Sequence, residues 1–95
     1  MNVIMIVNDT FRRDPLGCYG GTEVDTPYLD AFAREAAIFD QYYIGSYPTV
    51  PNRWDLCTGR FGFATRGWQP LAPADVTLAQ RLAAAGAHTQ MIWDT

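Results

Sequence analysis

The sequence predicts an α/β fold with a mainly parallel sheet. The run Val3–Val7 is continuously apolar and mostly β-branched, which is typical of a central strand in a parallel sheet. Two later stretches, at about residues 27–36 and 77–85, repeat apolar side chains at helical spacing. Strands that alternate with helices of crossover length are typical of a parallel α/β sheet.

The first predicted strand leads into a loop and then a helix. Phe11–Asp25 contains one proline and three glycines, which together indicate a loop. Thr26 is suited to be an N-cap, because its hydroxyl can accept from N–H groups at the helix start, and Pro27 suits the first helical position. The predicted helix extends to about Ala36.

The middle of the chain predicts an extended segment and a short helix. Ile38–Ile44 alternates loosely between apolar and polar residues, which favours a strand or an extended segment. Val50–Thr58 is compatible with a short helix. Gly59 suits its end, because glycine adopts the left-handed conformation without strain.

The last part of the chain predicts a loop, a helix and a strand. Phe61–Pro73 is interrupted by glycine and proline, which indicates a loop. Either Asp75 or Thr77 caps a helix that extends to Ala85. His88–Trp93 is then predicted to form another strand.

Size, charge and composition limit the classes of protein. Ninety-five residues, 48% of them hydrophobic, suit one small packed unit. Three strands would leave a sheet edge and a sheet face uncovered, so we expect residues 1–95 to be the N-terminal segment of a larger catalytic domain. The net charge of −3 argues against a non-specific nucleic-acid binder. Two cysteines are too few for a disulfide scaffold or a metal finger.

The first residues indicate the cellular compartment that we expect. The apolar run after Asn2 has no basic leader before it and no cleavage site of small residues after it. It is also far shorter than a membrane span. We therefore expect a cytoplasmic protein without a membrane partner.

Asp9 is the first candidate site residue. It follows the predicted strand at its carboxyl end, where open α/β sheets bind ligands. A carboxylate at that position is suited to a hard divalent cation. The alternative is structural, because aspartate also closes turns through hydrogen bonds to nearby backbone groups.

The stretch "PTVPNR" holds the second candidate site. Thr49 stands at the start of the short helix, where N–H groups favour an anion, and Arg53 adds its donors one turn later. A hydroxyl at this position can attack phosphorus or sulfur if a metal lowers its pKa. The alternative is that Thr49 is only an N-cap and that Arg53 pairs with Asp55 or another carboxylate.

Four short motifs occur in order along the chain: "DTFRRDPLGCYG" (residues 9–20), "TPYLDAFA" (26–33), "TVPNR" (49–53) and "CTGR" (57–60). Each motif is weak alone, but in this order and spacing they resemble the N-terminal part of the sulfatase family in the alkaline phosphatase superfamily. The resemblance spans nearly the whole chain. It implies an alkaline-phosphatase-like α/β/α sandwich with a mainly parallel sheet, and a metal-dependent hydrolase of sulfate or phosphate esters.

The resemblance implies a role for individual residues. Asp9 corresponds to the family's first metal-binding aspartate, and Thr49 to the nucleophile, which also contacts the metal. Arg53 corresponds to the arginine that steadies the nucleophile and the anion. The metal would be a divalent ion such as Ca²⁺, Mn²⁺, Mg²⁺ or Zn²⁺. Apart from the resemblance, Arg12 and Arg13 are further candidates for contact with the anion, and the alternative is that these loop arginines are solvated or paired.

Three positions depart from the family's pattern. Thr10 stands where the family has a second aspartate ligand, and Asp94 stands where many members have an anion-binding lysine. Thr49 replaces the cysteine or serine that is oxidised to formylglycine. Because an oxidised threonine would be a ketone, we do not expect formylglycine here. An unmodified Thr49 would act as a metal-activated alkoxide, as in phosphodiesterase relatives that use threonine.

Two hypotheses of function follow from these residues. The first is a hydrolase of a small-molecule sulfate or phosphate ester, which acts only together with the remainder of its polypeptide. The second is a non-catalytic relative that keeps the fold as a binding or structural module. A nucleotide-binding or flavodoxin-like domain is disfavoured, because no glycine-rich phosphate loop follows the first strand. The sequence leaves the oligomeric state open.

Overall fold

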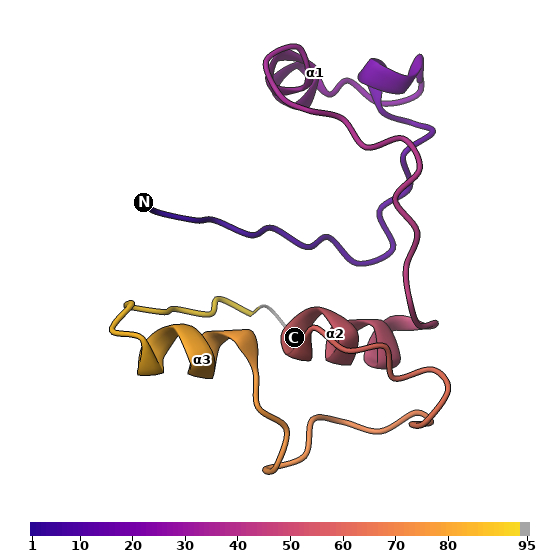
Figure 1. The fold of residues 1–95 in the computed structure, drawn as a ribbon. Helices are drawn as coiled ribbons and strands as arrows, with labels where there is room; N and C mark the ends of the chain where they lie inside the picture. Colours follow the sequence, from indigo (N-terminus) through magenta and orange to yellow (C-terminus); the bar gives the residue numbers. More distant parts are fainter. Residues whose placement is uncertain (94–95) are drawn as a thin grey trace. The chain divides into compact units, whose positions relative to one another are not determined.

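The structure is a computed structural model that describes residues 1–93 (Figure 1). The chain divides into two compact units, Met1–Tyr42 and Tyr43–Thr95, and each is described by itself. The helical elements of the described residues are η1 (Gly17–Tyr19), α1 (Pro27–Ala33), α2 (Thr49–Thr58) and α3 (Leu78–Ala84). In this part of the chain no helix has the length and apolar character needed to cross a membrane.

The three predicted strands are not paired in the described part of the chain. Val3–Val7 has no regular secondary structure, and its five side chains are between 53% and 86% exposed. Ile38–Ile44 and His88–Trp93 likewise contain no strand. A strand forms only when a neighbouring strand takes up its N–H and C=O groups, so an apolar pattern alone does not create one. The predicted parallel sheet is therefore not seen among residues 1–93.

In the first unit, η1 and α1 pack against each other through Asp30. The Asp30 carboxylate accepts from the amide of Cys18 at 2.8 Å and from the hydroxyl of Thr26 at 3.1 Å. Thr26 precedes α1, as predicted, but its Oγ accepts from the amide of Gly17 at 3.0 Å instead of capping the helix. The last residue of α1 is Ala33, so the helix is shorter than the apolar pattern predicts.

In the second unit, α2 begins one residue before the predicted start and ends, as predicted, at Thr58, with Gly59 as its C-cap. Gly59 has a φ of 70°, in the left-handed region that glycine adopts without strain. Its amide donates to the carbonyl of Asp55 at 2.8 Å. Pro48 stands before the helix, after a cis peptide bond. Pro51 lies in the first turn, where its missing N–H removes no helical hydrogen bond.

Thr77, and not Asp75, caps α3. Thr77 Oγ accepts from the amide of Gln80 at 3.3 Å, and Gln80 Oε1 accepts from the amide of Thr77 at 2.8 Å. This reciprocal pair is a capping box, which satisfies two N–H groups of the helix start. The helix ends at Ala84, close to the predicted end. Within the second unit, α2 and α3 lie beside each other (Figure 1).

Trp54 is a large apolar side chain of α2, and it is buried, with 7% of its surface exposed. Its Nε1 donates to Asp75 Oδ2 at 3.0 Å, and the guanidinium carbon of Arg66 lies 5.1 Å from its ring centroid. Arg66 also pairs with Asp75, at 3.3 Å. These three residues, the Trp54–Arg66–Asp75 cluster, tie the predicted loop Phe61–Pro73 and the residues after it to α2.

The surroundings of Asp75 favour its ionised form. The amide of Ala72 donates to Asp75 Oδ2 at 2.7 Å, in addition to the Trp54 indole. These two hydrogen bonds, with a smaller contribution from Arg66, hold the pKa of the Asp75 carboxyl below its ordinary value, and burial opposes them. The cluster is therefore a charged one at neutral pH.

Candidate active site

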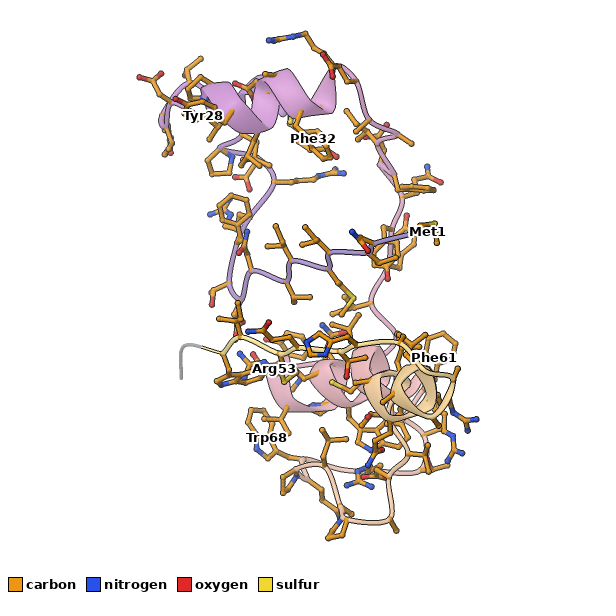
Figure 2. All side chains as sticks on the ribbon, turned by 90° about the vertical axis from the view of Figure 1, so that its left-hand side faces the viewer. Met1, Tyr28, Phe32, Arg53, Phe61 and Trp68 are labelled. Carbon is orange, nitrogen blue, oxygen red and sulfur yellow. The ribbon has the colours of Figure 1, made fainter. Side chains whose placement is uncertain are left out.

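Thr49 and Arg53, the two predicted catalytic residues, lie on one face of α2. Thr49 is the first helical residue and Arg53 is the fifth, a spacing that puts both side chains on the same side of a helix. The N–H groups of the first turn point toward the N-terminal end of a helix and favour an anion there. Both side chains are half-buried, and Figure 2 shows Arg53 on this helix.

Arg53 lies against the ring of Trp93. The guanidinium carbon is 4.3 Å from the centroid of the ring. An arginine at this distance from a tryptophan face makes a cation–π contact. Asp55, the partner considered for Arg53 in the structural alternative, is engaged by the amide of Gly62 at 2.8 Å.

Asp55 is a buried carboxylate of α2 that binds the segment after the helix. It is 9% exposed, and its Oδ1 holds the Gly62 amide that follows the helix. Its Oδ2 lies beside Gly45, where an added Cβ would fall 2.8 Å from that oxygen and would clash with the ring of Phe61. Among the described residues, Asp55 Oδ2 and Ser46 Oγ are buried without a hydrogen-bond partner. The carboxylate therefore holds the segment that leaves α2 by a hydrogen bond and lies close to the segment that enters it.

Asp9 and Thr10 lie on an exposed turn in the first unit, directly after the predicted first strand. Thr10 Oγ donates to Asp9 Oδ1 at 3.4 Å. Thr10 has a φ of 58°, a left-handed conformation that costs a β-branched residue about 1–2 kcal/mol. A carboxylate beside a hydroxyl offers the oxygen ligands that hard divalent ions take, so this pair fits part of a metal site.

Arg12, a further candidate for contact with an anion, is bound to Asp14. Its Nε donates to Asp14 Oδ1 at 2.9 Å, and its Nη2 donates to Asp14 Oδ2. This exposed pair lowers the pKa of the Asp14 carboxyl through the hydrogen bond from Arg12. An anion would have to displace Asp14 to reach this guanidinium.

The remaining candidate residue, Asp94, lies outside the described residues. Among residues 1–93, no group of three or more His, Cys, Asp or Glu side chains could hold a metal ion. Asp9 belongs to the first unit and Thr49 to the second.

The contact of Trp93 with Arg53 and the hydrogen bond from Gly62 to Asp55 were not predicted from the sequence. The place of Trp93 at the carboxyl end of a predicted strand is a signal for its contact, because open α/β sheets gather functional side chains at that end. Gly45 before the short helix and Gly62 after it are a signal for the contacts of Asp55, because glycine permits the close approach of another group.

Similarity to known proteins extends over almost the whole chain. The profile of the sulfatase family, described as "Sulfatase", matches residues 1–94. The chain therefore belongs to the sulfatase family, and the resemblance inferred from the four motifs is confirmed. The family has an alkaline-phosphatase-like α/β fold, and its activity is the hydrolysis of sulfate esters.

Individual relatives are sulfatases from bacteria and mammals. The chain is 31% identical to the N-acetylgalactosamine-6-O-sulfatase of Bacteroides thetaiotaomicron over 96% of its length and 19% of the relative's. It is 31% identical to the steryl-sulfatase of Mus musculus over 96% of its length and 17% of the relative's. It is 34% identical to the arylsulfatase A of Homo sapiens over 95% of its length and 20% of the relative's. The chain thus spans about a fifth of the length of these relatives. No solved structure matches it.

Proposed function

We propose that the complete gene product is a metal-dependent hydrolase of sulfate or phosphate esters in which Thr49 is the nucleophile. The observation that carries this proposal is the position of Thr49 as the first residue of α2, with Arg53 one turn later on the same face. In the resemblance, these two positions are those of the family's nucleophile and its arginine. The three named relatives are sulfatases, which supports ester hydrolysis as the reaction class.

The chemistry of this pair is nucleophilic substitution at a tetrahedral centre. Thr49 Oγ loses its proton to a base and forms a bond to sulfur or phosphorus, while the bond to the ester oxygen breaks and the alcohol leaves. Arg53 donates to the non-bridging oxygens, where negative charge increases in the transition state. Water then cleaves the covalent bond to Thr49 and restores the hydroxyl.

A divalent cation fits this proposal. The resemblance implies that Asp9 holds it and that Thr49 is a further ligand, and Ca²⁺, Mn²⁺, Mg²⁺ and Zn²⁺ all accept carboxylate oxygen. When bound, such an ion supplies positive charge that lowers the pKa of a hydroxyl ligand. Without it, a threonine hydroxyl is a weak nucleophile at neutral pH.

The identity of residue 49 as threonine also affects which class of ester we expect as the substrate. Oxidation of a threonine gives a ketone, so Thr49 does not provide the aldehyde of formylglycine. A direct alkoxide nucleophile, by analogy with relatives that use threonine, favours phosphate monoesters or diesters. We therefore include phosphate esters beside the sulfate esters that the named relatives suggest.

A second candidate function is that of a non-catalytic relative. Thr10 favours it, because this position carries a hydroxyl bound to Asp9 instead of a second carboxylate. One negative charge fewer weakens the affinity for a divalent cation. Such a protein would keep the fold as a binding or structural module.

The test compares Thr49→Ala with Thr49→Ser in the complete gene product. Turnover of an aryl sulfate, a phosphate monoester and a phosphodiester is measured with Mn²⁺ or Ca²⁺. We expect Thr49→Ala to lower kcat by at least about a thousandfold, because no nucleophile remains, and Thr49→Ser to stay active. Turnover that survives Thr49→Ala would contradict the role of Thr49. A wild-type protein that binds metal but turns over none of the three substrates would favour the non-catalytic candidate.

A further inference from the structure

The first turn of α2, which carries Thr49, has no side-chain cap. Its N-cap residue is Pro48, whose side chain has no oxygen that could accept from the N–H groups of the turn. Helix ends fray where no cap holds them. The support for this turn therefore has to come from the packing of neighbouring segments.

The segment that enters α2 lies against Asp55, six residues after Thr49 on the same helix. A Cβ added to Gly45 would fall 2.8 Å from Asp55 Oδ2 and 2.1 Å from the ring of Phe61, so the backbone of Gly45 lies directly against both side chains. The next residue, Ser46, is only 2% exposed. Packing thus restrains the entering segment to within three residues of Thr49.

Asp55 is the less mobile of the two side chains that lie against Gly45. It is 9% exposed, and its Oδ1 accepts from the amide of Gly62 at 2.8 Å. Phe61 is 80% exposed, so its ring can turn away from Gly45 at little cost. The buried carboxylate therefore limits how closely the entering segment approaches the helix.

We propose that Asp55 is a positioning residue for Thr49. Its bond to Gly62 and its contact with Gly45 hold the segments on the two sides of α2, and the entering segment keeps the uncapped first turn helical. The inference rests on the proposed function for the role of Thr49 as the nucleophile. Because a displacement of reacting groups by about 1 Å can lower a rate by about a hundredfold, the contact acts on the rate of the chemical step.

The first experiment compares Asp55→Ala with Asp55→Asn in the metal-loaded complete gene product, on the ester that the wild type turns over fastest. Asparagine keeps the shape beside Gly45 and an oxygen that accepts from the amide of Gly62, whereas alanine removes both. We expect Asp55→Ala to lower kcat by about tenfold to a hundredfold, with a smaller change in KM. Asp55→Asn should stay within about threefold of the wild type. The thermal unfolding midpoint of each variant shows whether it is folded at the assay temperature.

Gly45→Ala tests the same contact from the entering segment. The added Cβ would be too close to Asp55 Oδ2, so we expect kcat to fall by about tenfold. Gly67→Ala is the matched control, because a Cβ at Gly67 would meet no atom within 4 Å, and kcat should not change. In the Asp55→Ala background the carboxylate is absent, so Gly45→Ala should lower kcat by less than it does in the wild type.

Amide hydrogen exchange of the same proteins gives a readout that needs no turnover. Exchange in the first turn of α2 should be about tenfold faster in Asp55→Ala and in Gly45→Ala than in the wild type, because the turn opens more often. Exchange in α3 should stay the same in all three proteins. If Asp55→Ala does not fold, Gly45→Ala and its control Gly67→Ala decide the question.

Two results would overturn the positioning role: equal exchange in the first turn of α2 in the wild type and both variants, and a kcat of Asp55→Ala equal to that of the wild type. The outcome is distinguishable from that of the proposed function. Faster exchange in Asp55→Ala, in a protein without turnover, would support the role of Asp55 in holding this turn and contradict the role of Thr49 as the nucleophile. Turnover that depends on Thr49 but not on Asp55 would do the reverse.

Discussion

Thr10 has a strained backbone conformation and lacks the negative charge that an aspartate would have at this position. Its left-handed φ of 58° is a conformation that aspartate and asparagine adopt more readily than threonine. In the resemblance, an aspartate at this position is a metal ligand. We therefore predict that Thr10→Asp raises the affinity of the complete gene product for Mn²⁺ or Ca²⁺ by at least about tenfold, because ligand charge sets the affinity of such sites.

Thr10→Asn separates charge from backbone strain. Asparagine relieves the strain in the same way as aspartate but brings no charge. Calorimetric titration with the metal should therefore give Thr10→Asn an affinity close to that of the wild type. Equal affinities for Thr10→Asp and Thr10→Asn would mean that this position does not contact the metal.

The stability of the packing around α2 should depend on pH through Asp75. The folded-state pKa of Asp75 is lowered by the Ala72 amide and the Trp54 indole, so its contribution to stability is fully present above the ordinary pKa of an aspartate, about 4. That contribution is lost as the pH falls through the lowered pKa. We predict that Asp75→Asn is less stable than the wild type at pH 7 and that the difference shrinks below about pH 4.

Urea unfolding of the complete gene product at pH 7, 5, 4 and 3 tests this prediction. The midpoint of the wild type should fall toward that of Asp75→Asn as the pH decreases. Asp25→Asn is the control, because Asp25 is exposed, and its midpoint should follow the wild type at every pH. A constant difference between the wild type and Asp75→Asn from pH 7 to pH 3 would contradict the role given to the charged carboxylate.

Helices were predictable where the signals lie within the helix itself. The end of α2 at Gly59 and the cap of α3 at Thr77 follow from short local patterns, although Asp75 offered an equal alternative for the cap. The choice of Thr77 depends on Gln80, whose side chain completes the capping box. The end of α1 was predicted too late, because alanines continue the apolar pattern beyond Ala33 while the helical hydrogen bonds do not.

For the candidate site, the placement of Thr49 and Arg53 on one helix was predictable from the sequence. The spacing of Thr49 and Arg53 is set by helix geometry and can be seen in five residues. The contact of Arg53 with Trp93 joins residues far apart in the sequence, and no local pattern specifies such a contact. The same holds for the bond from Gly62 to Asp55, which depends on the path of the loop after α2.

The exposed apolar segments determine how stable the 95-residue chain is by itself. The sulfatase family has an α/β fold, yet Val3–Val7 and Ile38–Ile44 expose their large apolar side chains in the described residues. Burying such side chains is the main favourable term in folding, so a chain that leaves them exposed gains little stability. We predict that the 95-residue chain alone binds a hydrophobic dye, unfolds in urea without a cooperative transition, and hydrolyses no ester.

Ile6→Asp, made in both proteins, tests the physical reason for that prediction. Ile6 is 79% exposed in the 95-residue chain, so the substitution should leave its circular dichroism unchanged. In the complete gene product, where the α/β fold of the family would bury this strand on both faces, an unpaired carboxylate should prevent folding or lower the unfolding midpoint severely. Tyr28→Asp, at a side chain that is 90% exposed on α1, is the matched control for an acidic substitution. A cooperative transition in the 95-residue chain, or tolerance of Ile6→Asp by the complete gene product, would show that the first strand does not depend on neighbours outside residues 1–95.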